Sequence, residues 1–385
     1  MRVLVVHNRY SSASPSGENR VVDDDVKRLR DDGVEIETYE RDSDEIAEFS
    51  IARKVELPLR PTYSYEDAKR FRAVLERFGP DVVHIHNVFP LISPAIIPLA
   101  KQAGAATVQT VHNYRHVCPA GTLFRDGRPC EQCVTTRTAW PAVVHGCYRD
   151  SRAASVSMSL SRTLSARRWD AIDRFLAVSE VVAERLRDFG VPKERIAIHP
   201  NVLADPGEPP ALGHNVAYIG RLCNEKGTSV LLDAWSNSHQ RKKRKLHIAG
   251  GGPLEQLVRA AADADPSVVF HGLVPEHKID ELLADAALVV APSVWLDPDP
   301  LSAIRALALG RPLVASNRGA FPSYVNDTNG WLTVPEPAAL AKAIDAAFES
   351  RPELERRSAG ARQTYLQGRT PSRHRLIDVY SSLAT

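Results

Sequence analysis

The sequence predicts an α/β fold with two doubly wound domains, each a parallel sheet covered by helices on both faces. Short apolar runs typical of buried strands alternate along the chain with amphipathic stretches typical of helices. The alternation is interrupted at Leu203 to Gly213, where Asp-Pro-Gly-Glu-Pro-Pro is typical of a linker, and then resumes. A chain of 385 residues is long enough for two domains of ordinary size. We therefore expect two Rossmann-like domains that face each other across a cleft.

The first domain is expected to cover residues 1–204. Its apolar runs predict buried strands at Val3–His7, Glu35–Tyr39, Val82–His86, Thr107–Val111, Phe175–Val178 and Ile196–His199. Its amphipathic stretches predict helices at about Glu18–Asp32, Tyr65–Phe78, Pro94–Ala103, Ala154–Ile172 and Glu180–Phe189. A cysteine-rich insert at about residues 115–150 shows neither the periodicity of a strand nor that of a helix.

The second domain is expected to cover residues 205–365. Its predicted strands are Asn215–Ile219, Lys245–Ala249, Ser267–Phe270, Ala287–Ala291 and Leu313–Ser316, with helices between them. The end of the chain is mostly helical, and we expect residues 366–385 to form a helix that packs back on the first domain.

Charge and hydropathy exclude several classes of protein. Lys and Arg number 49 and Asp and Glu 47, so the net charge of +2 does not favour nucleic-acid binding. No apolar run approaches the roughly 18 residues of a membrane-spanning helix, which makes a cytoplasmic protein the expectation. The basic run Arg241–Lys245 is interpreted as a solvated helix end. The helix near Ser161–Arg168 is either a solvated face or a weak peripheral contact with an anionic membrane.

The start of the second domain contains a candidate anion site. Gly220 and Arg221 follow a predicted strand, and Lys226 stands five residues later at the head of a helix. Two cations beside a helix N-terminus suit a diphosphate. The alternative is a surface loop in which Arg221 pairs with Glu225. Gly250, after the next strand, is interpreted either as a close approach to a ligand or as a tight turn.

A second candidate site lies between Pro292 and Pro312. A buried strand ends at Pro292, and Asp299 and Pro300 are expected to be the N-cap and first residue of a helix that stops at Gly310. The arrangement of strand, loop and helix N-terminus predicts that a phosphorylated donor binds here.

Four of the five cysteines, Cys118, Cys130, Cys133 and Cys147, are clustered with the spacing C-x11-C-x2-C-x13-C. The close pair is typical of tetrahedral metal sites, so we expect a structural zinc ion. Free or paired thiols and an iron–sulfur cluster are the alternatives. Four thiolates leave no open position on the metal, and therefore no catalytic metal is expected.

Several motifs occur together in a characteristic order. In the second half they are Gly220-Arg221 with Glu225-Lys226-Gly227, Gly250-Gly251-Gly252-Pro253, His271-Gly272-Leu273-Val274-Pro275, Pro292-Ser293-Val294-Trp295 and Ala306-Leu307-Ala308-Leu309-Gly310-Arg311-Pro312. In the first half they are Pro80-Asp81-Val82-Val83-His84-Ile85-His86, Thr110-Val111-His112, Val178-Ser179-Glu180 and Pro200-Asn201-Val202. By these motifs, nearly the whole chain resembles the retaining glycosyltransferases of family 4, which have the GT-B fold.

The resemblance implies a hexosyltransferase that moves a sugar from a nucleotide-diphospho-sugar, most often a UDP-hexose, to a hydroxyl group of a small molecule or glycan. The biological context would be natural-product or polysaccharide biosynthesis. In this family the second domain holds the nucleotide and the first holds the acceptor. Transfer proceeds with retained configuration and no catalytic metal.

The resemblance also assigns roles to individual residues. The catalytic set would be His112, Arg221, Lys226 and Asp297, with Arg221 and Lys226 stabilising the leaving diphosphate. The donor-binding set would be Gly17, Gly220, Arg221, Lys226, Gly250, Gly272, Asp297, Pro300, Leu301, Ser302 and Arg305. Ser16 replaces one glycine of the family's N-terminal glycine pair. His84 and His86 are interpreted as packing residues at a strand end.

One pair of positions departs from the family pattern. Where the family has two glutamates eight residues apart, this chain has Asp297 and Arg305. A guanidinium has donors and no acceptor, so Arg305 cannot receive ribose hydroxyl protons. Arg305 would pair with Asp297 or Asp299, contact an extra anionic group on an unusual donor, or mark a catalytically impaired or regulatory relative that binds nucleotide or glycan.

Overall fold

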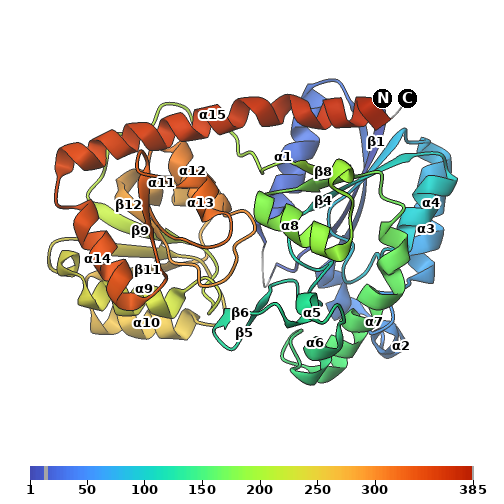
Figure 1. Ribbon diagram of the computed structural model, residues 1–385, viewed down its shortest axis with the longest axis horizontal. Helices are drawn as coiled ribbons and strands as arrows, with labels where there is room; N and C mark the ends of the chain where they lie inside the picture. The colour runs from blue at the N-terminus through green and yellow to red at the C-terminus, as the bar shows by residue number, and fades with distance from the viewer. Residues whose placement is uncertain (13–15, 384–385) are drawn as a thin grey trace. The chain divides into compact units, whose positions relative to one another are not determined.

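The computed structural model describes residues 1–12 and 16–383, except for the side chains of residues 369–375. The chain forms two compact units (Figure 1). Unit 1 comprises Met1–Leu123, Cys130–Asn201 and the residues from Ser372 onward, and unit 2 comprises Phe124–Pro129 and Val202–Pro371.

Unit 1 is built on a six-stranded parallel sheet in the order β2-β1-β3-β4-β7-β8. Its strands are β1 (Arg2–Arg9), β2 (Glu35–Asp42), β3 (Val82–Ile85), β4 (Ala106–Val111), β7 (Arg174–Ala177) and β8 (Ile196–Ile198). Its helices are α1 (Gly17–Asp31), α2 (Ile51–Glu56), α3 (Tyr65–Phe78), α4 (Ile96–Gln102), α5 (Gln132–Thr135), α6 (Trp140–Val144), α7 (Arg152–Trp169) and α8 (Glu180–Phe189).

Unit 2 repeats this design with a second six-stranded parallel sheet in the order β11-β10-β9-β12-β13-β14. The strands are β9 (Asn215–Ile219), β10 (Leu246–Ala249), β11 (Val268–Gly272), β12 (Ala286–Ala291), β13 (Leu313–Ser316) and β14 (Gly330–Thr333). The helices are α9 (Thr228–Asn237), α10 (Glu255–Ala264), α11 (Glu276–Asp285), α12 (Leu301–Ala308), α13 (Phe321–Tyr324) and α14 (Pro337–Ala347). The predicted pair of doubly wound domains is thereby confirmed.

Both sheets bury apolar residues on their two faces, as parallel sheets covered by helices must. Every residue of β12 is buried, and Leu288 and Val290 belong to one core cluster of unit 2 while Val289 and Ala291 belong to another. This two-faced burial is why the strands appear in the sequence as continuous apolar runs. No helix within residues 1–12 and 16–383 is both long enough and apolar enough to cross a membrane.

The cysteine-rich insert, whose residues Phe124–Pro129 are grouped with unit 2 and the rest with unit 1, has more local structure than its sequence indicates. The strands β5 (Phe124–Arg125) and β6 (Arg128–Pro129) form a short antiparallel hairpin, and α5 and α6 follow it. Short 3-10 turns occur elsewhere, at Ser43–Glu48, Lys193–Arg195 and His239–Lys242.

The last helix, α15 (Arg351–Leu383), has residues in both units. In unit 2, the Tyr365 hydroxyl donates to the carbonyl oxygen of Leu203 at 2.9 Å. In unit 1, the Tyr380 hydroxyl lies 2.6 Å from Nδ1 of His84, whose Nε2 lies 2.8 Å from the Thr110 hydroxyl. Tyr380 and His84 are both fully buried. His84 is therefore a structural residue that anchors the end of the chain on the first sheet.

Candidate active site

Each sheet has one point at which the strand order reverses, and ligands of doubly wound proteins bind there, beyond the carboxyl ends of the strands. In unit 2 this point lies between β9 and β12, which end at Ile219 and Ala291. In unit 1 it lies between β1 and β3, which end at Arg9 and Ile85. Most of the predicted site residues follow these strands or their immediate neighbours.

In unit 2, the loops after β9 and β12 bring Lys226 and Asp297 together. Nζ of Lys226 donates to Oδ2 of Asp297 at 2.6 Å, and the Ser293 hydroxyl donates to the same oxygen at 3.2 Å. The ammonium also lies 5.3 Å from the centre of the Trp295 ring. Asp297 is 2% exposed, whereas 26% of the Lys226 side chain is exposed. The buried carboxylate therefore fixes an ammonium group that an anion can still reach.

Arg221 belongs to the same loop and forms an ion pair with Glu225. This is the pairing that the sequence offered as the alternative to an anion site. The Arg221 side chain remains 43% exposed, so the ion pair orients the guanidinium without enclosing it. The loop thus presents two cations, each held by a carboxylate from unit 2.

Gly250 is required by a close approach of two backbone segments. Its φ is +145°, and a Cβ atom there would come within 1.9 Å of the carbonyl oxygen of Gly220. The loops after β9 and β10 can cross at this distance only if the residue is glycine. Gly272, at the end of β11, has a φ of +68° and open space around it, and Gly17 is the first residue of α1.

The start of α12 differs from the expectation. Pro300 is the N-cap, Leu301 and Ser302 form the first turn, and no side chain caps the helix. Asp299 is not the N-cap, because its Oδ1 accepts a hydrogen bond from the Tyr324 hydroxyl and the extended residue before the helix is Pro300. The N-cap residue Pro300 therefore supplies no side-chain cap to the N–H groups of this first turn.

Arg305 pairs with neither Asp297 nor Asp299. Its guanidinium binds both carboxylate oxygens of Asp280, on the neighbouring helix α11, at 2.7 and 2.8 Å. It also donates to the carbonyl oxygen of Glu276 at 3.2 Å. The sequence did not indicate Asp280, because the contact joins residues 25 positions apart on two helices.

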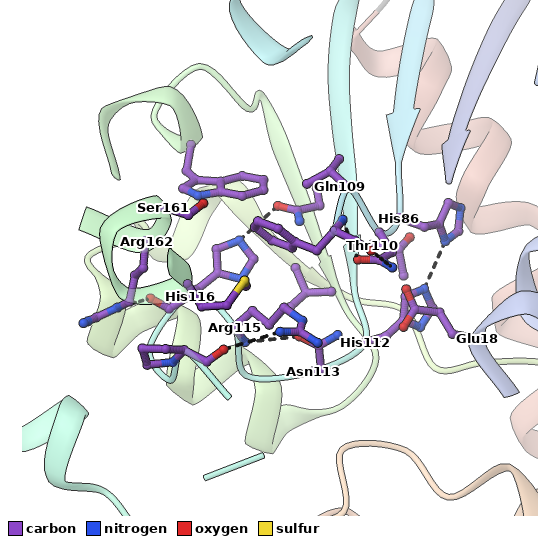
Figure 2. A pocket seen from close by; sticks show the side chains of 17 residues that line it. Glu18, His86, Gln109, Thr110, His112, Asn113, Arg115, His116, Ser161 and Arg162 are labelled. Atoms are coloured by element: carbon purple, nitrogen blue, oxygen red, sulfur yellow. Dashed lines mark hydrogen bonds between the residues drawn. The ribbon is translucent and has the colours of Figure 1, made fainter. Parts of the chain in front are cut away.

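Unit 1 has a pocket beyond the ends of β3 and β4 (Figure 2). His86 follows β3, His112 follows β4, Glu18 comes from α1, and Arg115 and His116 come from the start of the insert. Met158, Ser161, Arg162 and Trp169 of α7 complete this wall. Of the residues to which the family resemblance assigns a catalytic or donor-binding role, His112 is the one that lines this pocket.

The histidines of the pocket are uncharged near neutral pH. Nδ1 of His86 lies 3.0 Å from Nε2 of His112, and the two rings are stacked (Figure 2). Burial lowers the pKa of His112 to about 3, with neighbouring histidines adding to the effect, and burial likewise lowers the pKa of His116 to about 3. His86 therefore lines the pocket as a hydrogen-bonding partner of His112, beyond the packing role predicted for it.

Several polar atoms of the pocket wall have no hydrogen-bond partner among the described residues. They are Nε2 of His86, Nε of Arg115 and Nδ1 of His116. His86 is 4% exposed and His116 is 7% exposed. Buried polar groups are normally paired, so unpaired ones that line a cavity indicate a site for a polar ligand.

Glu18 is a pocket residue that the sequence interpretation missed. Its carboxylate accepts a hydrogen bond from the Tyr10 hydroxyl at 3.1 Å, and the residue is 8% exposed. Burial raises the pKa of Glu18 to about 7, although Tyr10 and Arg115 oppose the shift. The signal available in the sequence was its position directly after Gly17, which was itself predicted to be a ligand-binding residue.

Among the described residues, the four cysteines of the insert form no disulfide bond, and Cys118 and Cys133 are buried. Burial raises the pKa of Cys133 to about 11, and the nearby Cys118 and Cys147 thiols contribute to the increase. Within residues 1–12 and 16–383, no three His, Cys, Asp or Glu side chains form a group that could hold a metal ion. The zinc site stays a prediction.

Comparison with known families now places the chain. The model described as Glycosyltransferase Family 4 matches residues 15–203, and the model described as Glycosyl transferases group 1 matches residues 213–350. The chain belongs to the family 4 glycosyltransferases. The two matches correspond to unit 1 and unit 2, so this family 4 chain has the expected GT-B architecture.

Curated relatives of this family 4 chain match over part of their length. The putative colanic acid biosynthesis glycosyltransferase WcaL of Escherichia coli is 29% identical over 44% of this chain and 46% of the relative. The phosphatidyl-myo-inositol mannosyltransferase of Mycobacterium leprae is 30% identical over 46% of this chain and 48% of the relative. The alignments thus span about half the length of these curated relatives.

Solved structures resemble the whole chain at low identity. Sucrose-phosphate synthase from Thermosynechococcus elongatus matches with a TM-score of 0.72 and 16% identity, over 99% of this chain and 98% of that structure. Anabaena Alr3699/HepE in complex with UDP and glucose matches with a TM-score of 0.68 and 15% identity, over 99% of both chains. At this identity the likeness concerns the fold alone.

Proposed function

We propose that this protein is a retaining hexosyltransferase that moves a sugar from a nucleotide-diphospho-sugar to a hydroxyl group of an acceptor. The observation that carries the proposal is the cationic group at the reversal point of unit 2, where Asp297 fixes Lys226 and Glu225 fixes Arg221. Two oriented cations match the charge of a diphosphate leaving group. UDP-glucose is one donor to test, because it is bound in a solved structural neighbour. GDP-mannose is the other, because relatives in Mycobacterium tuberculosis are named for it.

In the proposed reaction, unit 2 holds the donor. Lys226 and Arg221 stabilise the negative charge that develops on the diphosphate as the glycosidic bond breaks. Gly220, Gly250 and Gly272 allow the backbone to approach the nucleotide, and the first turn of α12 offers N–H groups of Leu301 and Ser302 to the donor. The acceptor oxygen attacks the anomeric carbon of the sugar on the same face from which the leaving diphosphate departs. An oxygen of that diphosphate takes the proton of the acceptor hydroxyl. No metal takes part in these steps.

The pocket of unit 1 is proposed to hold the acceptor. A hydroxyl group can both donate and accept hydrogen bonds, which suits the carboxylate of Glu18 and the unpaired ring nitrogens of His86 and His116. His112 is uncharged and hydrogen-bonded to His86, and its other ring nitrogen would form one hydrogen bond with a sugar hydroxyl.

The change at position 305 supports ordinary donor binding. Because Arg305 is paired with Asp280, its charge is balanced within unit 2. Asp280 also restores a carboxylate next to the position where the family has glutamate. The side chain of Asp280 is 40% exposed, so its remaining lone pairs are open to ribose hydroxyl groups.

The insert is proposed to contain a structural zinc ion bound by Cys118, Cys130, Cys133 and Cys147. Support comes from the C-x2-C spacing and from the electrostatic influence that Cys118 and Cys147 exert on Cys133. A bound cation would favour the thiolates over the thiols. Arg115 and His116 directly precede this segment, so the zinc ion would stabilise one wall of the acceptor pocket.

Product formation from a panel of donors tests the proposed function. The purified chain is incubated with UDP-glucose, UDP-galactose, UDP-N-acetylglucosamine or GDP-mannose and with mixed hydroxylated acceptors, and release of nucleoside diphosphate and glycoside is followed by mass spectrometry. A product with the anomeric configuration of the donor supports the proposal. Binding of UDP or GDP without turnover of any donor would identify a non-catalytic relative.

A further inference from the structure

Helix α7 has a polarity opposite to that of an ordinary surface helix. Most of its buried residues are serines, namely Ser155, Ser157, Ser159, Ser161 and Ser165. Its solvent face instead carries Val156, Leu160 and Leu164, which are 48, 41 and 57% exposed and follow one another at single-turn intervals. A helix that lies between a core and water is expected to show the reverse distribution.

Hydrogen bonds of the buried serines fix this orientation. The hydroxyls of Ser157 and Ser161 donate to the carbonyl oxygens of Pro58 and Pro61, in the segment after α2. On the other side, the Ser159 hydroxyl donates to the carbonyl oxygen of Ala139, directly before α6. Helix α7 is therefore tied to both neighbouring segments, and its aliphatic residues must point outward.

The neighbouring segments extend this apolar surface. Of the sixteen large hydrophobic side chains exposed in the described part of the chain, ten belong to α2, α6, α7, the residues between α2 and α3, and the first residue of α3. We call these ten the apolar surface: Ile51, Val55, Leu59, Tyr63, Tyr65, Trp140, Val144, Val156, Leu160 and Leu164. Helices α6 and α7 pack against each other, the segment after α2 is hydrogen-bonded to α7, and all three helices appear at the lower edge of unit 1 (Figure 1). An apolar concentration of this kind marks a surface that binds another molecule or a membrane.

Basic residues outnumber acidic ones around the apolar surface: residues 48–65 and 137–168 contain nine Lys or Arg and three Asp or Glu, of which Glu48 and Glu56 are exposed beside α2. Residues 137–168 contain six arginines and a single acidic residue, Asp150. Arg137, Arg149, Arg152 and Arg167 are exposed. Such a surface, with aliphatic side chains, a tryptophan and arginines, has the composition of segments that lie in the interface of anionic lipid bilayers.

We propose that the outer face of α2, α6 and α7 binds peripherally to a membrane that contains anionic lipids. The aliphatic side chains and Trp140 enter the headgroup region, while the arginines pair with lipid phosphates. A second copy of the chain is a poorer occupant, because a symmetric dimer through this face would bring arginines against arginines. The inference does not depend on the transfer reaction.

Membrane binding here would also determine where the candidate acceptor pocket lies. Met158, Ser161 and Trp169 of α7 line that pocket, whereas Leu160 and Leu164 occupy the opposite face of the same helix. The pocket would therefore lie about one helix diameter, roughly 10 Å, above the lipid surface.

Vesicle sedimentation of the full chain tests the proposal. Wild-type protein is expected to sediment with vesicles of equal parts phosphatidylglycerol and phosphatidylcholine, to remain in solution with pure phosphatidylcholine, and to be released by high salt. The variant Leu160→Gln/Leu164→Gln should bind at least tenfold more weakly. The affinity of Arg152→Gln/Arg167→Gln for these vesicles should be about 20- to 30-fold lower, because two lipid-facing charges are removed. Tryptophan emission should shift to the blue on vesicles in wild type and shift less in Trp140→Phe.

Matched controls use exposed residues of the same types elsewhere. Leu257→Gln/Leu332→Gln changes two exposed leucines of unit 2, and Arg30→Gln/Arg72→Gln changes two exposed arginines on α1 and α3. Both should bind like wild type. Circular dichroism verifies that every variant is folded. Failure of folded wild type to bind anionic vesicles, or equal binding by Leu160→Gln/Leu164→Gln, would overturn the proposal. If wild type does not bind lipid but forms a dimer in light scattering, and Leu160→Gln/Leu164→Gln abolishes that dimer, the surface would be assigned to a second copy instead.

Discussion

Arg305 and Asp280 form a two-point ion pair between helices α12 and α11, with nitrogen–oxygen distances of 2.7 and 2.8 Å. The pair occupies the position where the family pattern has a glutamate, and it places a carboxylate there that belongs to a different helix. Planar two-point pairing is specific to arginine among the cationic side chains. The substitution at position 305 is therefore understood only together with Asp280.

A charge-reversal pair tests this relationship. Arg305→Glu should reduce donor affinity, because it places a carboxylate beside Asp280 and Glu276 and removes the donor that orients Asp280. The double variant Arg305→Glu/Asp280→Arg should recover part of the loss, since it restores an opposite-charge pair. UDP and GDP titrations by calorimetry supply the affinities for a double-mutant cycle. A coupling of zero between the two positions would contradict the proposed joint role.

Lys226→Ala is expected to lower turnover by two or more orders of magnitude, because one oriented charge beside the leaving group is lost. Lys278→Ala is the matched control, since Lys278 is an exposed lysine of unit 2 that pairs with Glu281. Steady-state kinetics with the preferred donor provide the measurement. If Lys226→Ala kept near wild-type turnover, the assignment of the leaving-group site would be wrong.

Glu18 should make the stability of unit 1 decrease as the pH rises. Its pKa is raised from 4.5 to about 7 by burial, so between these values the folded state retains a proton that the unfolded state releases. Stability is therefore present below about pH 4.5 and is lost as the pH rises through 7, by on the order of 3 kcal/mol.

Glu18→Gln removes this titration and should flatten the profile between pH 5 and pH 8. Asp25, whose pKa burial raises to about 6, changes stability in the same direction, but it does so in both proteins and cancels in their difference. Thermal unfolding midpoints of wild type and variant across this pH range give the comparison. If the unfolding midpoints of the two proteins changed with pH in parallel, Glu18 would not have the raised pKa that its burial implies.

The proposed zinc site makes a prediction about metal content. Elemental analysis of the purified chain should find about one equivalent of zinc, and Cys118→Ser and Cys133→Ser should each remove it. Cys223→Ser is the control, because Cys223 is a buried free thiol outside the insert. Less than half an equivalent of zinc in wild-type protein would argue against the site, and iron in its place would indicate a cluster.

The sequence alone determined the architecture of both units, because parallel strands buried on two faces produce apolar runs that local pattern reveals. Local sequence patterns also predicted where the loops around Gly220, Lys226 and Asp297 lie, because glycines and short motifs mark the end of each strand. These features depend on neighbours in the chain, and so they can be predicted without coordinates.

Only the tertiary structure decided which side chains meet. The pairs Lys226–Asp297 and Arg305–Asp280 join residues 71 and 25 positions apart, and no spacing rule connects them. The same holds for Glu18 in the pocket of His112, for Asp299 bound to Tyr324 and not to the helix, and for the apolar surface on α7. Burial and long-range pairing arise from how whole elements pack, and this physical information is not contained in any short stretch of sequence.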